Sequence, residues 1–203
     1  EVEGSAQRES AKPGDIRFKD LNSDDVLDEQ DRTKIGDPWP DFVYGLSLGA
    51  TWKGFDFNVF FQGSQGNDVL NMTLRDFESG TGTMNAREGF LNRAWNGEGS
   101  TDKYHRISAE QGQNSEISDY FVEDGSYLRL KNLQLGYNFC ERLLKIKGIS
   151  YLRLYVSAQN LFTLTKYSGL DPEIGSSNAT LNGIDQGFYP QARTWTVGLN
   201  IKF

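Results

Sequence analysis

Hydrophobic and polar residues alternate without a break through residues 194–203. The apolar positions are Trp195, Val197, Leu199, Ile201 and Phe203, and small or polar residues stand between them. Side chains along a strand point alternately to opposite faces, so this period of two predicts a strand with one apolar face. Its length suits a tilted strand that crosses a bilayer, which takes about 9–11 residues. We expect the five apolar side chains to face the membrane, although a soluble sheet can alternate in the same way.

Residues 41–62 repeat this pattern in two segments and predict a hairpin. Aromatic and aliphatic side chains occupy every second position of residues 42–52 and again of residues 55–61. Lys53 and Gly54, between the two segments, are typical of a tight turn. The intervening positions are mostly small or polar, which suits a barrel lumen and equally the solvated face of a soluble sandwich.

Residues 126–140 and 151–165 predict two further strands. Arg129 and Lys131 share the parity of Leu133 and of the apolar residues that follow it. We therefore expect both basic side chains on the outer face, at the level of the lipid headgroups or above it. An outer face that changes from basic to apolar along its length fits a strand that leaves the bilayer.

The connections between these five predicted strands fall into two classes. If the terminal strand ends on the short-turn side, the short connections 53–54 and 140–150 share one end, and the long connections 63–125 and 168–190 share the other. Outer-membrane barrels are built in this way. Five strands cannot close a membrane barrel, for which about eight is the minimum, and open edges are not tolerated in lipid. We therefore expect the chain to be part of a larger barrel.

Composition narrows the classes further. The 203 residues have a mean hydropathy of −0.58 but include 13% aromatic residues and 22 glycines. No run approaches the roughly 18 apolar residues of a membrane helix, which leaves a strand-built membrane protein open. The net charge of −7 argues against nucleic acid as a partner. The single cysteine, Cys140, excludes an intrachain disulfide and a multi-cysteine zinc site. The chain starts at Glu1 without an initiator methionine or a signal segment, so we expect processing or truncation.

An acidic turn at residues 20–31 has metal-ligand spacing. Numbered from Asp20, oxygen-bearing side chains occupy positions 1, 3, 5, 9 and 12, as in an EF-hand loop, with a backbone carbonyl at position 7. The predicted ligands are Asp20, Asn22, Asp24, Asp28, Asp31 and the carbonyl of Val26. Hard oxygen ligands of this kind predict Ca²⁺ as a cofactor. Asp25 stands where a glycine usually makes the turn, and the alternative is a solvated acidic turn.

Residues 63–125 contain no long strand pattern and one helical stretch near 85–95. Loops of this length on a rigid scaffold commonly carry recognition. Aromatic side chains that can stack on sugar rings or pack on a partner are Trp95, Tyr104, Tyr120 and Phe121. The alternative is that Trp95 and Phe90 only fold the loop onto itself. The lone histidine, His105, is more typical of a loop residue than of a base or metal ligand, so we expect no enzymatic activity.

Several short motifs follow one another along nearly the whole chain. They are PGDI at 13–16, IGDPWPDF at 35–42, FFQG at 60–63, SDY at 118–120, EDGSYLRLKN at 123–132, QNLFT at 159–163 and YSGLDPE at 167–173. With these motifs the chain resembles the C-terminal end of the SusC/RagA family of TonB-linked outer-membrane transporters. Asp25 is the main departure, because such proteins usually have glycine there.

The resemblance implies an all-β fold, in which the chain supplies the last five antiparallel strands of a transmembrane barrel of about 22 strands. It implies an extracellular loop at residues 1–40, a hairpin at 41–62, a long extracellular loop at 63–125 and the last three strands at 126–203. The plug domain would be absent from this chain. The family imports glycans or peptides with energy from TonB, under a SusD-like surface lipoprotein that acts as a lid. The implied partners are therefore the plug and upstream strands of the same transporter, that lipoprotein, TonB and the lipid of the bacterial outer membrane.

Two other classes remain open at this point. A secreted β-sandwich that binds carbohydrate would explain the aromatic residues and a calcium loop, but not the separation of short and long connections. A barrel enzyme such as a phospholipase or protease lacks a catalytic constellation in this sequence. The transported substrate cannot be read from these residues, because ligand contacts in such a barrel come largely from the plug, other loops and the lid.

Overall fold

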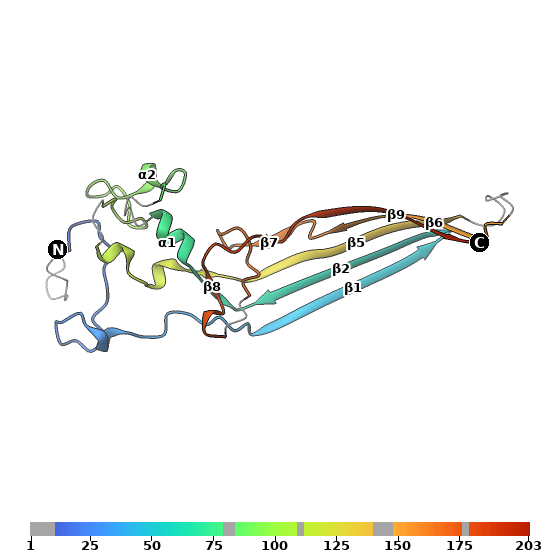
Figure 1. The fold of residues 1–203 in the computed structure, drawn as a ribbon. Coiled ribbons are helices and arrows are strands. Elements are labelled where there is room, and N and C mark those ends of the chain that lie inside the picture. Colours follow the sequence, from blue (N-terminus) through green and yellow to red (C-terminus); the bar gives the residue numbers. More distant parts are fainter. Residues whose placement is uncertain (1–10, 79–83, 109–111, 140–147, 176–178) are drawn as a thin grey trace. The chain divides into compact units, whose positions relative to one another are not determined.

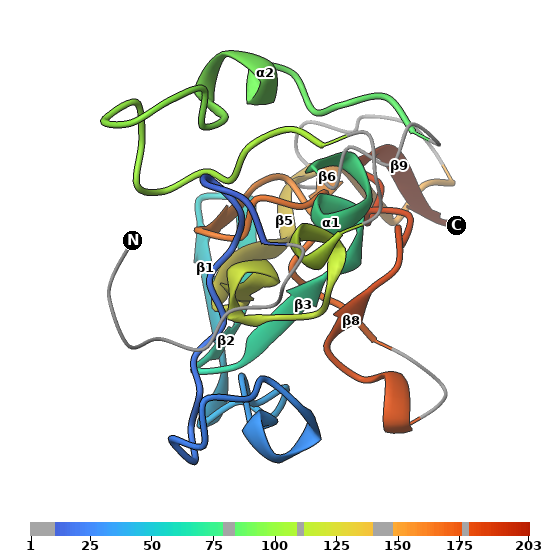
Figure 2. The ribbon, with the colours of Figure 1, turned by 90° about the vertical axis from the view of Figure 1, so that its left-hand side faces the viewer.

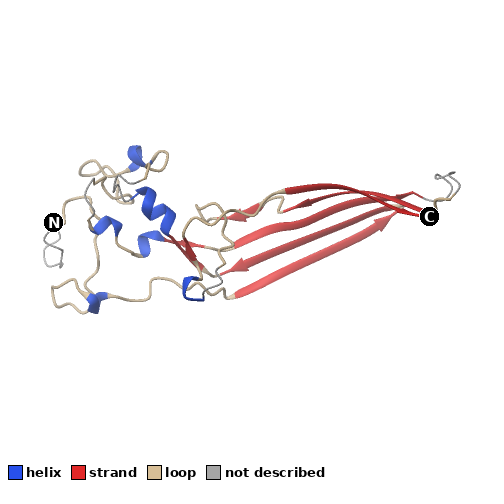
Figure 3. Cartoon of the chain, in the orientation of Figure 1, coloured by secondary structure: helices blue, strands red, loops and turns tan. Residues whose placement is uncertain are grey.

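The computed structural model describes residues 11–78, 84–108, 112–139, 148–175 and 179–203, which form two compact units. The first unit comprises Glu1–Asp37, Leu70–Val122 and Ile184–Gly187, and the second comprises Pro38–Val69, Glu123–Gly183 and Phe188–Phe203. Helices in the described residues are short, and none is long and apolar enough to cross a membrane (Figure 3).

The second unit is built on one antiparallel sheet of long strands (Figure 1). In sheet order these are β1 (Phe42–Trp52), β2 (Phe55–Gln65), β5 (Tyr127–Phe139), β6 (Tyr151–Gln159) and β9 (Thr194–Lys202). The short strand β7 (Thr163–Thr165) also pairs with β5, and the 3₁₀ turn η4 covers Ala179–Leu181. The five predicted strands and their antiparallel order are confirmed, with two changes in length. Strand β2 extends three residues beyond the predicted hairpin, and the strand predicted at 151–165 ends at Gln159, because Asn160 has a positive φ of 51° and residues 163–165 form the separate strand β7. Most of the short connection predicted at 140–150 lies outside the described residues.

The register places most of the apolar residues of the five long strands on one face, called here the apolar face. Residues directly opposite each other in a ladder present their side chains to the same face. Three rows across the sheet are Leu48, Val59, Leu133, Ala158 and Trp195; Ala50, Phe57, Leu135, Val156 and Val197; and Trp52, Phe55, Tyr137, Leu154 and Leu199. The opposite, polar face carries rows such as Gly49, Asn58, Gln134, Ser157 and Thr196.

A β-bulge at Lys131 reverses the expected direction of Arg129 on β5. Phe60 lies opposite Asn132, but Phe61 lies opposite Leu130, so Lys131 has no partner on β2 in this ladder. An extra residue in one strand changes the face of every side chain on one side of the bulge, here residues 127–130 relative to the rest of β5. Arg129 consequently lies opposite Gln62 and joins the polar face, so its predicted place on the outer face is wrong.

The first unit consists of short elements, several of which are labelled in Figure 2. They are η1 (Glu29–Asp31), α1 (Met72–Glu78), α2 (Phe90–Arg93), η2 (Gln113–Ser115), η3 (Asp119–Phe121) and β8 (Ile184–Asp185). Strands β3 (Asp68–Asn71) and β4 (Val122–Asp124) adjoin it in the sequence, and Leu70 of β3 pairs in parallel with Ile184 of β8.

The helix predicted near 85–95 is present only as the single turn α2. Gly89 precedes it with a positive φ of 74°, and Ala94 after it is extended, so the helix cannot continue in either direction. The helix α1 was not predicted. Asn71 Oδ1 accepts a hydrogen bond from Leu74 N at 2.8 Å, as an N-cap does, and that residue was the available signal.

Candidate functional site

An ion pair on the polar face joins β2 to β6 across the intervening strand β5. Arg153 Nε and Nη2 donate to Asp56 Oδ2 and Oδ1 at 2.9 and 2.5 Å. Both side chains pass over Gly136 of β5, where a Cβ would lie 2.5 Å from the Asp56 carboxylate. Asn138 adds a hydrogen bond to the same carboxylate at 3.0 Å. The missing side chain at position 136 therefore makes room for a pair that ties three strands together.

Tyr155 occupies the neighbouring position on the same face. Its ring lies over Gly198 of β9, where a Cβ would approach Tyr155 Cζ to 2.2 Å. The Arg153 guanidinium lies 4.8 Å from the centroid of this ring, within the range of a cation–π contact. The polar face is thus lined here by a charged and aromatic cluster that continues from β2 to β9.

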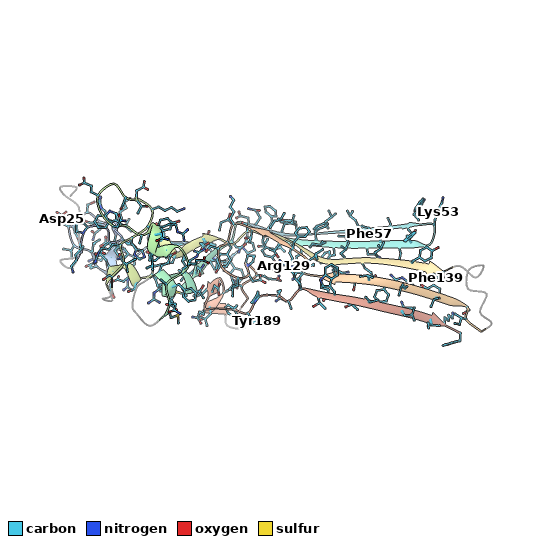
Figure 4. All side chains as sticks on the ribbon, turned by 90° about the horizontal axis from the view of Figure 1, so that it is seen from above. Asp25, Lys53, Phe57, Arg129, Phe139 and Tyr189 are labelled. Atoms are coloured by element: carbon cyan, nitrogen blue, oxygen red, sulfur yellow. The ribbon has the colours of Figure 1, made fainter. Side chains whose placement is uncertain are left out.

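A second charged cluster lies near the other end of the strands and centres on Arg129, which is 2% exposed. Figure 4 shows Lys53 and Phe139 toward one end of the sheet and Arg129 toward the other. Arg129 donates to Thr163 Oγ1 at 2.8 Å, Glu173 Oε2 at 2.7 Å and Asp171 Oδ1 at 2.5 Å. Lys131 Nζ also contacts Glu173, at 2.8 Å. The cluster joins the sheet to the segment that follows β7.

The predicted calcium turn is folded around its own carboxylates. Asp20 accepts hydrogen bonds from Ser23 N and Asp25 N at 2.6 and 2.9 Å. Asp31 accepts from Leu21 N at 2.7 Å and Asp28 N at 3.0 Å, and these backbone bonds lower its pKa. The ionised carboxylates therefore stabilise the turn through backbone N–H groups.

The other predicted ligands follow the same rule. Asp24 accepts from Val26 N at 2.9 Å, Asn22 Oδ1 accepts from Asp24 N at 3.1 Å, and Asp28 accepts from Gln30 N at 2.7 Å. Across the residues that the structure describes, no three His, Cys, Asp or Glu side chains gather as metal ligands would. A carboxylate retains lone pairs after accepting one N–H, so the donor chemistry still fits a hard cation. Calcium binding stays a prediction.

Asp25 stands where an EF-hand loop usually has the glycine that makes the sharp turn. Its φ is 63° and that of Ser23 is 61°, so both residues adopt the left-handed conformation that glycine favours. Aspartate tolerates this conformation better than most residues. The turn is therefore made without the glycine, at some conformational cost.

The four aromatic residues proposed for recognition have different surroundings in the first unit. Phe121 is 0% exposed and packs edge-on against Tyr120 at 5.0 Å between centroids, so it cannot face a ligand in this structure. Tyr120 donates its hydroxyl to Glu78 at 3.1 Å, and burial beside that carboxylate raises its pKa. Trp95 lies against Gly14, and Tyr104 contacts the Arg93 guanidinium at 5.1 Å. The alternative interpretation, in which Trp95 and Phe90 fold the loop onto itself, fits Phe90, which is 1% exposed, and Trp95, which lies against Gly14. It applies equally to Phe121.

His105 belongs to this interior and is 4% exposed. Its ring lies 5.3 Å from that of Phe90 and 5.4 Å from that of Tyr120, and its Nδ1 is 2.8 Å from the carbonyl of Arg106. Burial lowers the pKa of His105 and keeps the ring neutral. His105 is therefore a packed residue of the first unit.

A part-buried ion pair lies in the same unit, between Arg106 and Asp15. Arg106 Nε lies 2.6 Å from Asp15 Oδ1, and Asn114 donates to the same carboxylate at 2.8 Å. Burial acts to raise the pKa of Asp15, but the hydrogen bonds from Arg106, Lys12 N and Asn114 outweigh it and hold that pKa below its usual value. Gly14 and Asp15, the centre of the PGDI motif, thus connect residues 85–115 to the start of the described chain.

A groove of about 940 Å³ also lies within the first unit, between residues 16–35 and 115–119. Apolar, basic and acidic side chains all line it, including Ile16, Arg17, Ile117 and Asp119. Ser118 lines it with a buried hydroxyl that has no hydrogen-bond partner among the described residues. The groove therefore has no single charge preference.

The terminal strand has the alternation that the sequence predicts. Leu199 lies opposite Leu154 and Val197 opposite Val156, on the apolar face. Exposed fractions are high for all five apolar residues; they are 65, 73, 54, 43 and 86% for Trp195, Val197, Leu199, Ile201 and Phe203. Contact with lipid stays a prediction for these side chains.

Sequence reasoning did not single out the two ion-pair clusters. Asp56 and Arg153 have opposite charges at polar positions of two predicted strands, which was a usable signal. The pairing of Arg129 with Asp171 was hidden, because 42 residues separate them and the bulge changes the face of Arg129.

Comparisons with known proteins place these features in context. No family model matches the chain. It is 42% identical over 197 residues to TonB-dependent receptor P3 of Formosa agariphila, covering 94% of this chain and 19% of that protein. It is 34% identical over 204 residues to TonB-dependent receptor SusC of Bacteroides thetaiotaomicron, covering 96% of this chain and 18% of SusC.

Solved structures give a similar result. The RagAB peptide importer in its closed-closed state matches with a TM-score of 0.73 and 29% identity, over 94% of this chain and 20% of the matched chain. The RagAB peptide transporter matches with a TM-score of 0.69 and 30% identity, over 82% and 17%. The chain thus spans about a fifth of the length of the relatives that it matches.

Proposed function

Because this chain belongs to the SusC/RagA family of TonB-linked outer-membrane proteins, as a C-terminal part of their β-barrel, we propose that it serves TonB-dependent import of a nutrient. The observation that carries the proposal is that the five long strands of the sheet share one continuous apolar face and one polar face. A barrel wall needs these two faces, one toward lipid and one toward the lumen. Exposed apolar area of this extent is uncommon on a soluble monomer.

In this proposal the apolar face contacts the outer-membrane lipid and the polar face lines the lumen beside the plug. Strands β1 and β9 are the two edges of this sheet, and sheet edges require neighbouring strands in a membrane. We propose that the remainder of the same transporter supplies them. The relatives are receptors and transporters, which supports a role without an enzymatic step.

The proposed partners are TonB and a SusD-like surface lipoprotein, and the proposed cargo is a glycan or a peptide. A peptide cargo is supported by the similarity to the RagAB structures, which are those of a peptide transporter and a peptide importer. A calcium ion in the turn at 20–31 would rigidify an extracellular loop and take no part in transport chemistry.

The first unit is proposed as the part that meets the lid or cargo. Replacing residues 84–104 entirely is a poor test, since Phe90 and Ala94 are buried there. Leu91 is 63% exposed and Met84 is 54% exposed, so charged substitutions at these positions test contact while leaving the interior intact.

The test of import uses the intact transporter in its own host. Deletion of its gene should abolish growth on one glycan or peptide source, and the wild-type gene should restore growth only when TonB is present. A Leu91→Asp, Met84→Asp variant should assemble normally but retain less surface lipoprotein on affinity purification. Growth that is independent of both the gene and TonB on every source tested would contradict the proposal.

A further inference from the structure

We propose that Arg129 is a positioning residue that seats residues 167–175 and 188–191 on the lumen face of the barrel wall. The proposal rests on the proposed function only where it calls the polar face the lumen. Arg129 lies on that face because the bulge at Lys131 places it opposite Gln62 and opposite Thr163 of β7. Its partners Asp171 and Glu173 must therefore also lie over this face.

Asp171 is the centre of the arrangement. Its Oδ1 accepts from Arg129 Nη2 at 2.5 Å and from Glu173 N at 2.9 Å, and its Oδ2 accepts from Gln191 N at 2.9 Å. One carboxylate thus holds the strand and two loop segments that are 20 residues apart. A loop of this length closes at an entropic cost that a shared, buried partner offsets.

Burial makes these contacts consequential. Arg129 is 2% exposed and Asp171 is 6% exposed, and hydrogen bonds to charged, buried groups are stronger than those between neutral groups. Burial acts to raise the pKa of Asp171, but the N–H groups of Gln191 and Glu173 and the Arg129 guanidinium outweigh it, so that pKa is lowered. Removing Arg129 leaves a buried carboxylate without its cation, which is a large penalty.

The anchored segments also carry exposed apolar side chains. Leu170, next to Asp171, is 75% exposed, and Tyr189, two residues before Gln191, is 90% exposed. Figure 4 labels Tyr189 beyond the strand end at which Arg129 lies. Loss of the anchor should therefore free both segments together, because both depend on the same carboxylate.

Hydrogen–deuterium exchange on the intact transporter tests this directly and needs no nutrient. In Arg129→Met we expect amide exchange in residues 168–175 and 188–193 to rise at least about tenfold, while β1 and β2 remain protected. Arg153→Met is the matched control, since it removes a guanidinium from the same face at the other end of the sheet. Arg129→Lys, which keeps the charge, should restore part of the protection.

The hydrogen–deuterium exchange experiment can fail without contradicting the import test, because it measures loop protection and not transport. If Arg129→Met fails to assemble, Asp171→Asn supplies the same test from the loop side, where the strand itself is unchanged. Unchanged exchange in both segments of a folded Arg129 or Asp171 variant overturns the proposal. An equal rise in the Arg153→Met control also overturns it, because the effect would then reflect a weaker barrel. Either result leaves TonB-dependent import untouched.

Discussion

Asp56 on β2 and Arg153 on β6 form a two-point ion pair that crosses β5 above Gly136, with N–O distances of 2.5 and 2.9 Å. The two residues are 97 positions apart in the sequence and are not on neighbouring strands. The pair is possible only because the strand between them carries a hydrogen atom in place of a side chain. This relationship makes Gly136 a specific point of weakness.

We expect Gly136→Val to impair barrel assembly. Its Cβ would lie 2.5 Å from Asp56 Oδ2 and 2.7 Å from Arg153 Nη2, so the ion pair must separate. Overpacking of this kind costs about 1–3 kcal/mol. The measurement is the folded fraction of the intact transporter in outer membranes, by heat-modifiable gel mobility. Gly175→Val is the control, because among the described residues other than its chain neighbours no atom lies within 4 Å of a Cβ at that position. Equal folded fractions for the two variants would contradict this role of Gly136.

The assignment of β9 side chains to the apolar and polar faces gives a second prediction. Leu199→Arg should lower the folding yield in liposomes, because a charge on the lipid face near the midplane costs about 2–4 kcal/mol. Thr196→Arg, on the polar face opposite Ser157, should fold normally. Asn200 is less suitable as the control position because it lies opposite Arg153, and like charges there would repel. Equal yields for Leu199→Arg and Thr196→Arg would reverse or remove the assignment of the faces.

The acidic turn yields a third prediction. If calcium binds, Asp25→Gly should increase calcium-dependent protection, since glycine adopts the observed φ of 63° without strain. Asp20→Ala combined with Asp24→Ala should abolish that protection. Trypsin cleavage at the exposed Lys19 and Arg32 reports the state of the turn, with calcium or with a chelator. A cleavage pattern that chelator does not alter would leave only a solvated acidic turn.

His105 gives a prediction for pH. Burial lowers its pKa in the folded chain, whereas the unfolded residue takes up a proton near pH 6.5. Below about pH 6.5 the unfolded state therefore binds more protons than the folded state. As the pH is lowered from about 6.5, the free energy of unfolding of the first unit should decrease until the folded pKa is reached. The nearby charges of Asp15 and Arg106 act on His105 in opposite directions.

The measurement is amide exchange in residues 90–106 at pH 7.5 and pH 5.5, corrected for the intrinsic rate. His105→Phe keeps an aromatic ring between Phe90 and Tyr120 but cannot titrate, so it should lose the dependence on pH. The same pH dependence in the variant and the wild type would assign the effect to another group.

The sequence by itself determined the strands and their two faces. Alternation is a local property, since each residue's side chain direction follows from that of its neighbour, and residues 42–52, 55–59 and 194–203 show it. The tight turn at Lys53 and Gly54 is equally local, and both residues have positive φ values in the structure. The SusC/RagA resemblance was also readable, because its motifs lie in one order along the chain.

Only the tertiary structure decided which side chains meet. The bulge at Lys131 depends on how β5 pairs with β2, and it moved Arg129 from the expected outer face to the polar face. Phe121 is as aromatic as a binding residue, yet it is fully buried because the first unit builds its interior from residues far apart in the sequence. Register, bulges and long-range ion pairs arise from contacts between distant segments, and a periodic pattern within one segment does not contain that information.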